Sequence, residues 1–377
     1  MVNKLRVTHE SGAIVGSNDD LLTEILRRLP FTSVFRFKSV SKHWHSLLSH
    51  RSFTLLYDNV PVSPGLFLHD LYIPFDLKNP SPPPFRTRDF YPNRDFGIMQ
   101  SCNGLLLCCS RRKYYVVNPT TKKFAIIPSV IGGSDARRTI GFEGFMGLAY
   151  HRADLHYKVV CLRDVSRYGR LFQIQIYSSN TGKWRISKQS IRASDYPGDS
   201  TLFCFVVYWN GAMHWIPGVD LVYFKLDQEK LKMMSLPERD LSSPRDEAPL
   251  YFGESGGHLH LVESISRKHR SRLNVYEMLS DYSGWVIKYQ VELDELRPLY
   301  NNSRGVGNYR LFEVFDVVRG EDEEESAFMV VKIQDKIIRY NFVNKSYEHI
   351  FDLPSHLCNQ GIGYNNVHRY IPMLSSF

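Results

Sequence analysis

Residues 114–128, YYVVNPTTKKFAIIP, have the pattern of a β-hairpin: an apolar, aromatic-bearing strand, a polar turn, and a second strand opening on a large residue. Four further segments repeat this arrangement in different residues: IQIYSSNTGKWRI from Ile174, LVYFKLDQEKLKMMSLP from Leu221, LNVYEMLSDYSGWVIKY from Leu273 and IIRYNFVNKSYEHIFDLP from Ile337. The opening residues are Phe124, Trp184, Leu231, Trp285 and Tyr347, at intervals of 60, 47, 54 and 62 residues. Self-similarity at about 50 residues predicts a repeat array such as a β-propeller.

A second hairpin precedes several of these copies. The segments SCNGLLLCC, VVYWNGAMHWI and YFGESGGHLHLVE centre on Asn103-Gly104, Asn210-Gly211 and Gly256-Gly257, turn dipeptides that tolerate positive φ. Two hairpins make one four-stranded propeller blade. The fold class expected is therefore an all-β, kelch-like propeller of about six four-stranded blades, with seven as an alternative.

Five repeats are explicit in the sequence, so the ring needs at least one more blade to close. The remaining strand-like segments are Leu66–His69 and Arg369–Leu374. Because an unpaired strand edge invites aggregation, we expect these two segments to pair and to complete a sixth blade.

The first sixty residues have helical patterning instead. Ser17-Asn18-Asp19-Asp20 resembles a capping box, and Pro30 ends the helix that follows. That helix carries a broad apolar stripe of Leu21, Leu22, Ile25, Leu26 and Leu29. Start signals at Thr32-Ser33 and Ser41 predict two more short helices, the last with Trp44 inward. So much apolar surface either binds a partner or packs on the rest of the chain.

These patterns divide the chain into four parts. Residues 1–16 are expected to be a disordered N-terminus and residues 17–57 a small all-α domain. Residues 58–98 are rich in proline and are expected to be a linker with a possible closing strand. Residues 99–377 are expected to form the propeller.

Composition narrows the functional classes. With 43% hydrophobic and 13% aromatic residues in 377, the chain can bury a large core. The six cysteines lack the spacing of a disulfide framework. The start lacks a signal-peptide pattern, and no apolar stretch of 18 residues occurs. We therefore expect a cytoplasmic or nuclear protein without membrane contact. The net charge of +8 raises a nucleic-acid alternative, but the basic residues are scattered in turns without a basic helix, so no nucleic-acid partner is expected.

Two catalytic or metal-binding patterns have simpler explanations. Residues 253–257, GESGG, match the G-x-S-x-G elbow of hydrolases around Ser255, but the exit alternates like a strand where that motif needs a helix. His258 and His260 share one face of that strand without an evident third metal ligand. We therefore expect no enzyme activity, no metal and no cofactor, with a hydrolase using Ser255 as a remote alternative.

Taken together, the two halves resemble the plant F-box proteins that carry an F-box-associated β-propeller domain. Residues 18–49, which include DDLLTEILRRLPFTSVFRFKSVSKHWHSLLS, resemble the F-box, and RFKSVSKHW at Arg36–Trp44 is the most specific stretch. SCNGLLLCC, NPTTKKFAIIP at Asn118–Pro128 and WNGAMHWI at Trp209–Ile216 are similar to the associated domain. One departure is that many F-boxes have Leu-Pro just before the first helix, where this chain has Ser17-Asn18-Asp19.

The resemblance implies a substrate receptor of a Skp–cullin–F-box ubiquitin ligase. In that role the F-box docks on a Skp-family adaptor and through it on a cullin scaffold, while the propeller holds an unknown target protein. A non-degradative F-box scaffold is the alternative. The apolar residues predicted to contact the adaptor are Leu22, Ile25, Leu29, Pro30, Val40 and Trp44.

Overall fold

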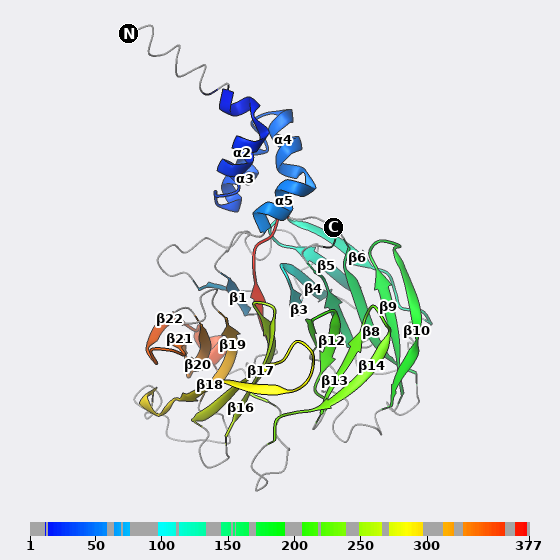
Figure 1. Cartoon of the computed structure of the whole chain (residues 1–377), viewed down its shortest axis with the longest axis vertical. Coiled ribbons are helices and arrows are strands. Elements are labelled where there is room, and N and C mark those ends of the chain that lie inside the picture. Colours follow the sequence, from blue (N-terminus) through cyan, green and yellow to red (C-terminus); the bar gives the residue numbers. More distant parts are fainter. Residues whose placement is uncertain are drawn as a thin grey trace.

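The computed structural model describes residues 12, 14–58, 64–68, 71–75, 97–110, 113–132, 145–151, 154, 156–165, 171–192, 206–217, 220–238, 249–265, 271–296, 312–319, 327–358 and 366–374. Short helices stand beside a ring of β-sheets (Figure 1). The predicted fold class, a small N-terminal all-α part followed by an all-β propeller, is confirmed.

The N-terminal part consists of α2 (Asp19–Leu26), α3 (Phe31–Phe37), α4 (Lys42–Ser49) and α5 (Arg51–Asp58). Asn18 caps α2, its side chain accepting a hydrogen bond from the Leu21 backbone N–H at 3.0 Å. Ser41 caps α4 in the same way, accepting from the Trp44 N–H at 3.1 Å. The predicted second and third helices are present, and α5 is an additional helix that capping signals did not reveal.

Five four-stranded antiparallel sheets correspond to the five sequence repeats. Blade 1 contains β3 (Gly97–Cys102), β4 (Leu105–Ser110), β5 (Lys113–Asn118) and β6 (Lys123–Ile127). Blade 2 contains β7 (Phe145–Ala149), β8 (Lys158–Asp164), β9 (Leu171–Ser178) and β10 (Lys183–Arg192). Blade 3 contains β11 (Val207–Trp209), β12 (Ala212–Trp215), β13 (Asp220–Lys225) and β14 (Lys230–Ser235).

Blade 4 contains β15 (Tyr251–Ser255), β16 (His258–Ser264), β17 (Arg272–Met278) and β18 (Trp285–Glu292), followed by the short 3-10 helix η3 (Asp294–Leu296). Blade 5 contains β19 (Glu313–Val318), β20 (Phe328–Ile333), β21 (Lys336–Asn341) and β22 (Tyr347–Asp352), followed by α7 (Ser355–Cys358). Each quoted repeat hairpin forms the two outer strands of its blade.

The sixth blade joins the two ends of the propeller. Its strands are β23 (Val367–Tyr370), β1 (Gly65–Leu68) and β2 (Leu71–Pro74), with β1 in the middle. Leu66 pairs with Arg369 and Phe67 with His368, so the predicted pairing between the two segments is confirmed. Within the described residues this sheet has three strands, not the four expected.

The boundaries of the closing strands differ slightly from the prediction. β23 ends at Tyr370, whereas the sequence suggested a strand as far as Leu374. Pro372 lacks a backbone N–H and cannot donate to a strand ladder, so residues 371–374 leave the sheet as an extended tail. The expected linker contains two strands, β1 and β2, where one was predicted, and His69 lies outside the described residues.

The innermost strands close a complete ring. In order around the axis, β23 contacts β3, β3 contacts β7, β7 contacts β11, β11 contacts β15, β15 contacts β19, and β19 returns to β23. The predicted number of six blades is therefore confirmed.

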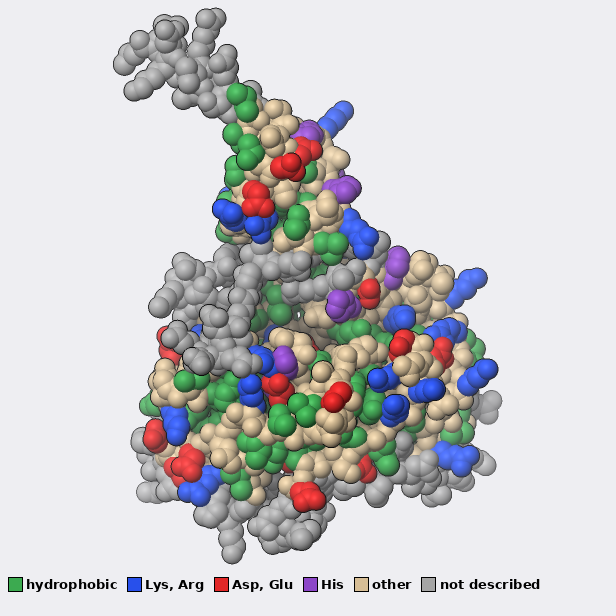
Figure 2. Space-filling model, in the orientation of Figure 1, with side chains coloured by type: hydrophobic (Ala, Val, Ile, Leu, Met, Phe, Trp, Pro, Cys, Tyr) green, Lys and Arg blue, Asp and Glu red, His purple; other side chains and the backbone are tan. Residues whose placement is uncertain are grey.

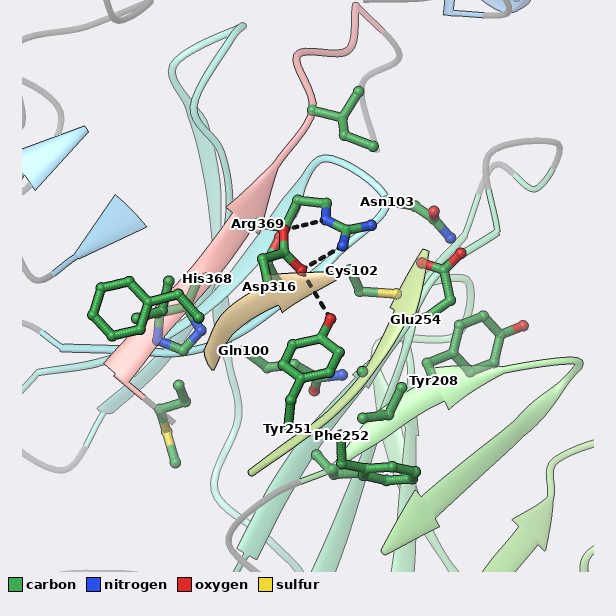
Figure 3. Close-up of a pocket in the computed structure, with 18 of the residues that line it drawn as sticks. Gln100, Cys102, Asn103, Tyr208, Tyr251, Phe252, Glu254, Asp316, His368 and Arg369 are labelled. Atoms are coloured by element: carbon green, nitrogen blue, oxygen red, sulfur yellow. Dashed lines mark hydrogen bonds and ion pairs between the residues drawn. The ribbon is translucent and has the colours of Figure 1, made fainter. Parts of the chain in front are cut away.

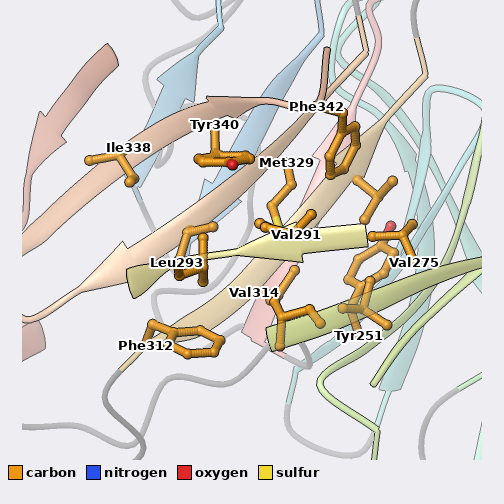
Figure 4. Close-up of a cluster of buried hydrophobic side chains, with 14 of the residues drawn as sticks. Tyr251, Val275, Val291, Leu293, Phe312, Val314, Met329, Ile338, Tyr340 and Phe342 are labelled. Carbon is orange, nitrogen blue, oxygen red and sulfur yellow. The ribbon is translucent and has the colours of Figure 1, made fainter. Parts of the chain in front are cut away.

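The hydrophobic core lies between blades and not within any one of them. Blades 4 and 5 enclose the largest cluster, in which Val275 and Val291 of one blade pack with Val314, Met329 and Ile338 of the next (Figure 4). Equivalent clusters fill the other interfaces. A single blade therefore has no buried core without its neighbours.

Polar side chains add hydrogen bonds between adjacent blades. The Trp184 indole donates to the Pro128 carbonyl at 2.7 Å, and the Trp209 indole donates to the Gly257 carbonyl at 2.6 Å. Gln100 donates to the Leu148 carbonyl at 3.1 Å and accepts from the Leu148 N–H, as a paired strand would. Trp184, which opens the second strand of its repeat hairpin, and Trp209 therefore join adjacent blades.

The first prediction concerns ring closure. Deleting residues 366–377 removes the innermost strand of blade 6, with Tyr370 fully buried, and takes one neighbouring strand from each of β1, β3 and β19. Several kcal/mol are lost, so we expect Tm to fall by roughly 10 °C or more. Differential scanning calorimetry measures this. Deleting only residues 375–377 is the matched control and should leave Tm nearly unchanged. A long truncation that melts like the full chain would contradict closure by β23.

Candidate functional site

The helices α2 to α5 form a small core and expose an apolar surface. Leu22, Leu26, Val34, Leu48 and Phe53 are at most 2% exposed. The Tyr57 hydroxyl donates to the Leu29 carbonyl at 2.8 Å, which joins the end of α5 to the end of α2. Leu21, Ile25 and Val40 remain 45%, 49% and 59% exposed. These three side chains leave apolar surface exposed on the helices.

The six residues predicted to bind an adaptor fall into three groups. Ile25, Pro30 and Val40 are exposed, and Leu29 and Trp44 are half-buried, with Trp44 packed on Phe37 at 5.5 Å between ring centroids. Leu22 is 2% exposed and lies in the core of the helices themselves. Their contact with an adaptor stays a prediction. The exposed Leu21 was not among the six, although its place on the apolar stripe is visible in the sequence.

One residue of the helical core comes from the other end of the chain. Leu374 is 2% exposed and packs in the cluster formed by Leu22, Leu26, Phe31 and Leu48. In Figure 1 the chain rises from β23, in red, toward α5. The C-terminal tail therefore connects the propeller to the helices by a hydrophobic contact, in addition to the covalent link after α5.

The tail is fastened to blade 1 along its path. The Met373 N–H donates to the Thr120 hydroxyl at 3.1 Å, and the Asn118 amide donates to the Met373 carbonyl at 3.4 Å. The Tyr370 hydroxyl hydrogen-bonds the Thr120 hydroxyl. Gly104 has φ +92°, and a Cβ there would lie 2.8 Å from the Ile371 carbonyl oxygen. The Asn103-Gly104 turn therefore makes room for the tail as well as reversing the chain.

The only sequence signal for this junction is the apolar tail YIPML at residues 370–374. Hydrophobicity near a terminus does not identify the surface on which the tail packs. Contact between residues 374 and 22 depends on ring closure, which brings both ends of the propeller to one place. That contact was not predicted.

A cavity of about 140 Å³ lies along the propeller axis, lined by β3, β11, β15, β19 and β23 (Figure 3). Arg369 donates from Nε to Asp316 Oδ2 at 2.7 Å and from its second nitrogen to Asp316 Oδ1. The Tyr251 hydroxyl donates to Asp316 Oδ1 at 2.8 Å. This bidentate pair joins the closing strand β23 to blade 5, and Tyr251 adds blade 4.

Burial and charge shape the ionisation of this network. Burial by itself would lower the pKa of Arg369, but the Asp316 carboxylate outweighs it and the pKa is raised, so the guanidinium stays charged. Burial, followed by the Asp316 charge, raises the pKa of Tyr251. Burial also raises the pKa of the nearby Cys102 thiol to about 12. Arg369, Asp316 and Tyr251 join the strands that surround the axis. Cys102 is a protonated thiol and not a reactive thiolate.

Ser255, the serine of the GESGG sequence, is buried in a contact between blades 4 and 5. It is 1% exposed, and its hydroxyl accepts a hydrogen bond from the Arg319 N–H of blade 5 at 2.9 Å. Gly256 and Gly257 adopt positive φ in the turn, and strand β16 follows. The predicted hairpin turn is confirmed, and the helix that a nucleophile elbow needs is replaced by a strand.

The two histidines of β16 lie between blades 4 and 5. His258 pairs with Glu277 at 2.9 Å, and Glu277 also binds Arg319 at 2.8 Å. His260 is 1% exposed, and burial lowers its pKa to about 3, so it is neutral. Among the described residues no group of three or more His, Cys, Asp or Glu side chains is arranged to hold a metal. The described helices include none long and apolar enough to cross a membrane.

The spacing of the six cysteines argued against a disulfide framework, and the structure describes the side chains of four of them. Cys102, Cys108 and Cys161 are buried and Cys109 is half-buried, and none of the four is in a disulfide. These four cysteines are therefore free thiols.

Known protein families match both parts of the chain. The F-box domain family matches residues 18–56, over α2 to α5, and the F-box associated beta propeller domain family matches residues 84–278. The chain is an F-box protein with an F-box-associated β-propeller. The resemblance noted in the sequence is thereby confirmed.

Relatives of this F-box protein in Arabidopsis thaliana extend over most of its length. F-box protein At5g07610 is 31% identical, over 92% of this chain and 88% of that protein. F-box protein At5g49610 is 28% identical, over 65% of this chain and 71% of that protein. Among solved structures, a chain in a crystal structure of a nidogen/laminin complex matches 82% of this chain and 99% of its own length, at 8% identity and a TM-score of 0.41.

The second prediction tests the Leu374 junction of the F-box protein. Leu374→Ala removes a buried side chain from the helical core, so the helices should lose about 2–5 kcal/mol of stability. Hydrogen exchange followed by mass spectrometry should show faster exchange in α2 to α5, with blades 2 to 4 unchanged. Leu374→Met, which conserves volume, is the control. Unchanged protection of the helices in the alanine variant would show that the tail does not hold them.

The third prediction separates the structural from the catalytic role of Ser255. Ser255→Ala leaves the Arg319 N–H without its acceptor, so we expect a loss of about 1–3 kcal/mol in the free energy of unfolding. Urea denaturation measures the loss. A fluorophosphonate probe should not label the wild-type protein at this position. Labelling of Ser255 in native protein would overturn the structural assignment and revive the hydrolase alternative.

Proposed function

We propose that this F-box protein is the substrate-recognition subunit of a Skp–cullin–F-box ubiquitin ligase. The observation that carries the proposal is the union, in one chain, of an F-box whose apolar residues remain exposed and a closed propeller. Leu21, Ile25 and Val40 are large apolar side chains that are 45%, 49% and 59% exposed, and an adaptor could cover the apolar surface they leave open. F-box proteins are generally non-catalytic adaptors, and Ser255 has a structural role here.

The propeller is a rigid scaffold of the kind that can bind a target protein. Its blades are joined by interblade hydrogen bonds and by the Arg369–Asp316 pair, and described hairpin turns such as Asn103-Gly104 and Gly256-Gly257 lie at the ends of its strands. Loops on a rigid scaffold can vary in sequence without altering the core, so they are suited to recognition. The Leu374 contact supports a defined placement of this scaffold relative to the F-box.

The visible surface favours a protein target over nucleic acid. In Figure 2, Lys and Arg side chains are interspersed with Asp and Glu over the ring, without one continuous basic stripe. A surface that binds the phosphate backbone concentrates basic residues along one track. Mixed charge of this kind fits a protein partner better.

The fourth prediction tests adaptor binding at the exposed helical surface. Replacing Ile25 and Val40 by lysine removes two apolar anchors without entering the helical core, and should cost roughly 2 kcal/mol or more each in binding free energy. Isothermal titration calorimetry with a purified Skp-family adaptor measures the loss. The matched control replaces Ile186 and Met233, exposed on the outer strands of blades 2 and 3, by lysine. Equal affinity of both double variants would contradict the assigned adaptor face.

A further inference from the structure

The central cavity is lined by two carboxylates, of which only one has a counter-charge. Asp316 is held in the bidentate pair with Arg369. Glu254 also lines the cavity, and no ion pair joins it to any residue that the structure describes. His368 lies on the far side of Arg369 from Glu254 (Figure 3). Because the Arg369–Asp316 pair carries no net charge, Glu254 gives its part of the cavity a negative potential.

The position of Glu254 in its blade directs it to the axis. Glu254 is the second-last residue of β15, the innermost strand of blade 4. Tyr208 holds the same position in β11 of blade 3, and Ser101 holds it in β3 of blade 1. All three residues line the cavity. The sequence patterns did not single out Glu254, because one acidic residue beside a glycine turn has no distinguishing spacing.

One oxygen of the Glu254 carboxylate is engaged and the other is free. Oε1 accepts a hydrogen bond from the Gly257 backbone N–H at 2.7 Å, which fixes the carboxylate beside the turn. Oε2 has no hydrogen-bond partner among the described residues. Glu254 is half-buried, so water solvates its charge less completely than at an exposed site. A role confined to the turn would need only Oε1, and a glutamine would serve it equally well.

The groups that line the cavity beside Glu254 are neutral. The Asn103 amide donates to the Tyr150 carbonyl at 2.7 Å, and its own oxygen has no partner among the described residues. The Cys102 thiol donates to the same carbonyl at 3.4 Å. Burial raises the pKa of Cys102 and of Tyr208 to about 12, so both groups stay protonated. None of these three side chains supplies a positive charge to Glu254.

The cavity has the size and the acceptors for one cationic side chain. Its volume of about 140 Å³ is below the roughly 300–1,000 Å³ of pockets that hold drug-sized ligands. The end groups of lysine and arginine carry only donors, which match the free oxygens of Glu254 and Asn103. The Tyr208 ring lines the same space and can add a cation–π contact.

Solvent reaches this part of the cavity. Asn103, Tyr208 and Glu254 are half-buried, whereas Asp316 is 2% exposed. Ile371, the first residue of the C-terminal tail, also lines the cavity. A side chain that enters beside Glu254 therefore lies next to the tail that packs on the F-box helices.

We propose that the central cavity binds a lysine or arginine side chain of the target protein, whose positive charge is met by Glu254. The proposal rests on the proposed function and assigns the point on the ring where the target is anchored. A charge-assisted hydrogen bond to Oε2 is the main contact, and Asn103 accepts a second hydrogen bond. The same carboxylate repels a phosphate or a carboxylate, so the cavity discriminates against acidic segments.

The test uses the full-length protein in complex with a Skp-family adaptor and short peptides with random flanking residues. Two matched pairs of peptide sets differ only at the central residue: arginine against citrulline, and lysine against norleucine. We expect the arginine or the lysine set to bind, and its uncharged counterpart to bind at least about tenfold more weakly, because a charge-assisted contact is lost. Free n-butylammonium, which mimics the end of a lysine side chain, should bind at least about tenfold more weakly than the lysine peptides, because it lacks the contacts of a peptide backbone.

Two variants locate the binding on the protein. Glu254→Gln removes the charge and keeps an acceptor for the Gly257 N–H, so it should weaken binding of the cationic peptides by about tenfold or more. The matched control is Glu348→Gln, at an exposed position of the outer strand β22, which changes the net charge equally and should have no effect. Circular dichroism melting of both variants checks that the ring is intact.

Four results would overturn the proposal: no binding of either cationic set, equal binding of charged and uncharged counterparts, full binding by Glu254→Gln, or an equal loss in Glu348→Gln. Binding of n-butylammonium as tight as that of the lysine peptides would overturn the assignment to a target side chain. Adaptor affinity measured on the same preparations keeps the two proposals apart. Loss of peptide binding with normal adaptor affinity affects the cavity alone, whereas failure to bind an adaptor contradicts the ligase role and leaves the cavity result standing.

Discussion

The antiparallel pairing of β1 with β23 is the interaction on which the rest of this molecule depends. Each blade buries its apolar faces only against its two neighbours, so the cores between blades exist only if the ring is complete. β23 supplies the innermost strand of the last blade, and its Arg369 forms the bidentate pair with Asp316 on the axis. A charged pair so deeply buried is costly unless both partners are held in register. The closing strand holds them there.

Ring closure also places the F-box. Because the last strand is the innermost one, the residues that follow it emerge at the end of the ring where the helices stand, and Leu374 enters the helical core. The helices are thus connected to the propeller through the C-terminal tail and not only through the chain after α5.

Several residues whose patterns suggested chemistry prove to be interblade contacts. Ser255 accepts a backbone hydrogen bond from the next blade, and His258 joins an ion network with Glu277 and Arg319. A propeller needs many polar contacts where two sheets meet near the axis, because the backbone groups at strand ends there must find partners away from water. Serine, histidine and glutamate at such places need no catalytic explanation.

The amino-acid sequence by itself determined the local and periodic features of this protein: hairpins spaced by about 50 residues, caps at Asn18 and Ser41, turns at Asn103-Gly104 and Gly256-Gly257, and the resemblance of both halves to F-box proteins. These depend on residues close together in the chain, where spacing and φ preferences are visible. Only the tertiary structure decided that Leu22 is buried in the helical core, that Leu374 packs among the helices and that Arg369 pairs with Asp316. Each joins residues from different repeats or opposite ends of the chain, and a closed ring brings them together in a way that no periodicity specifies.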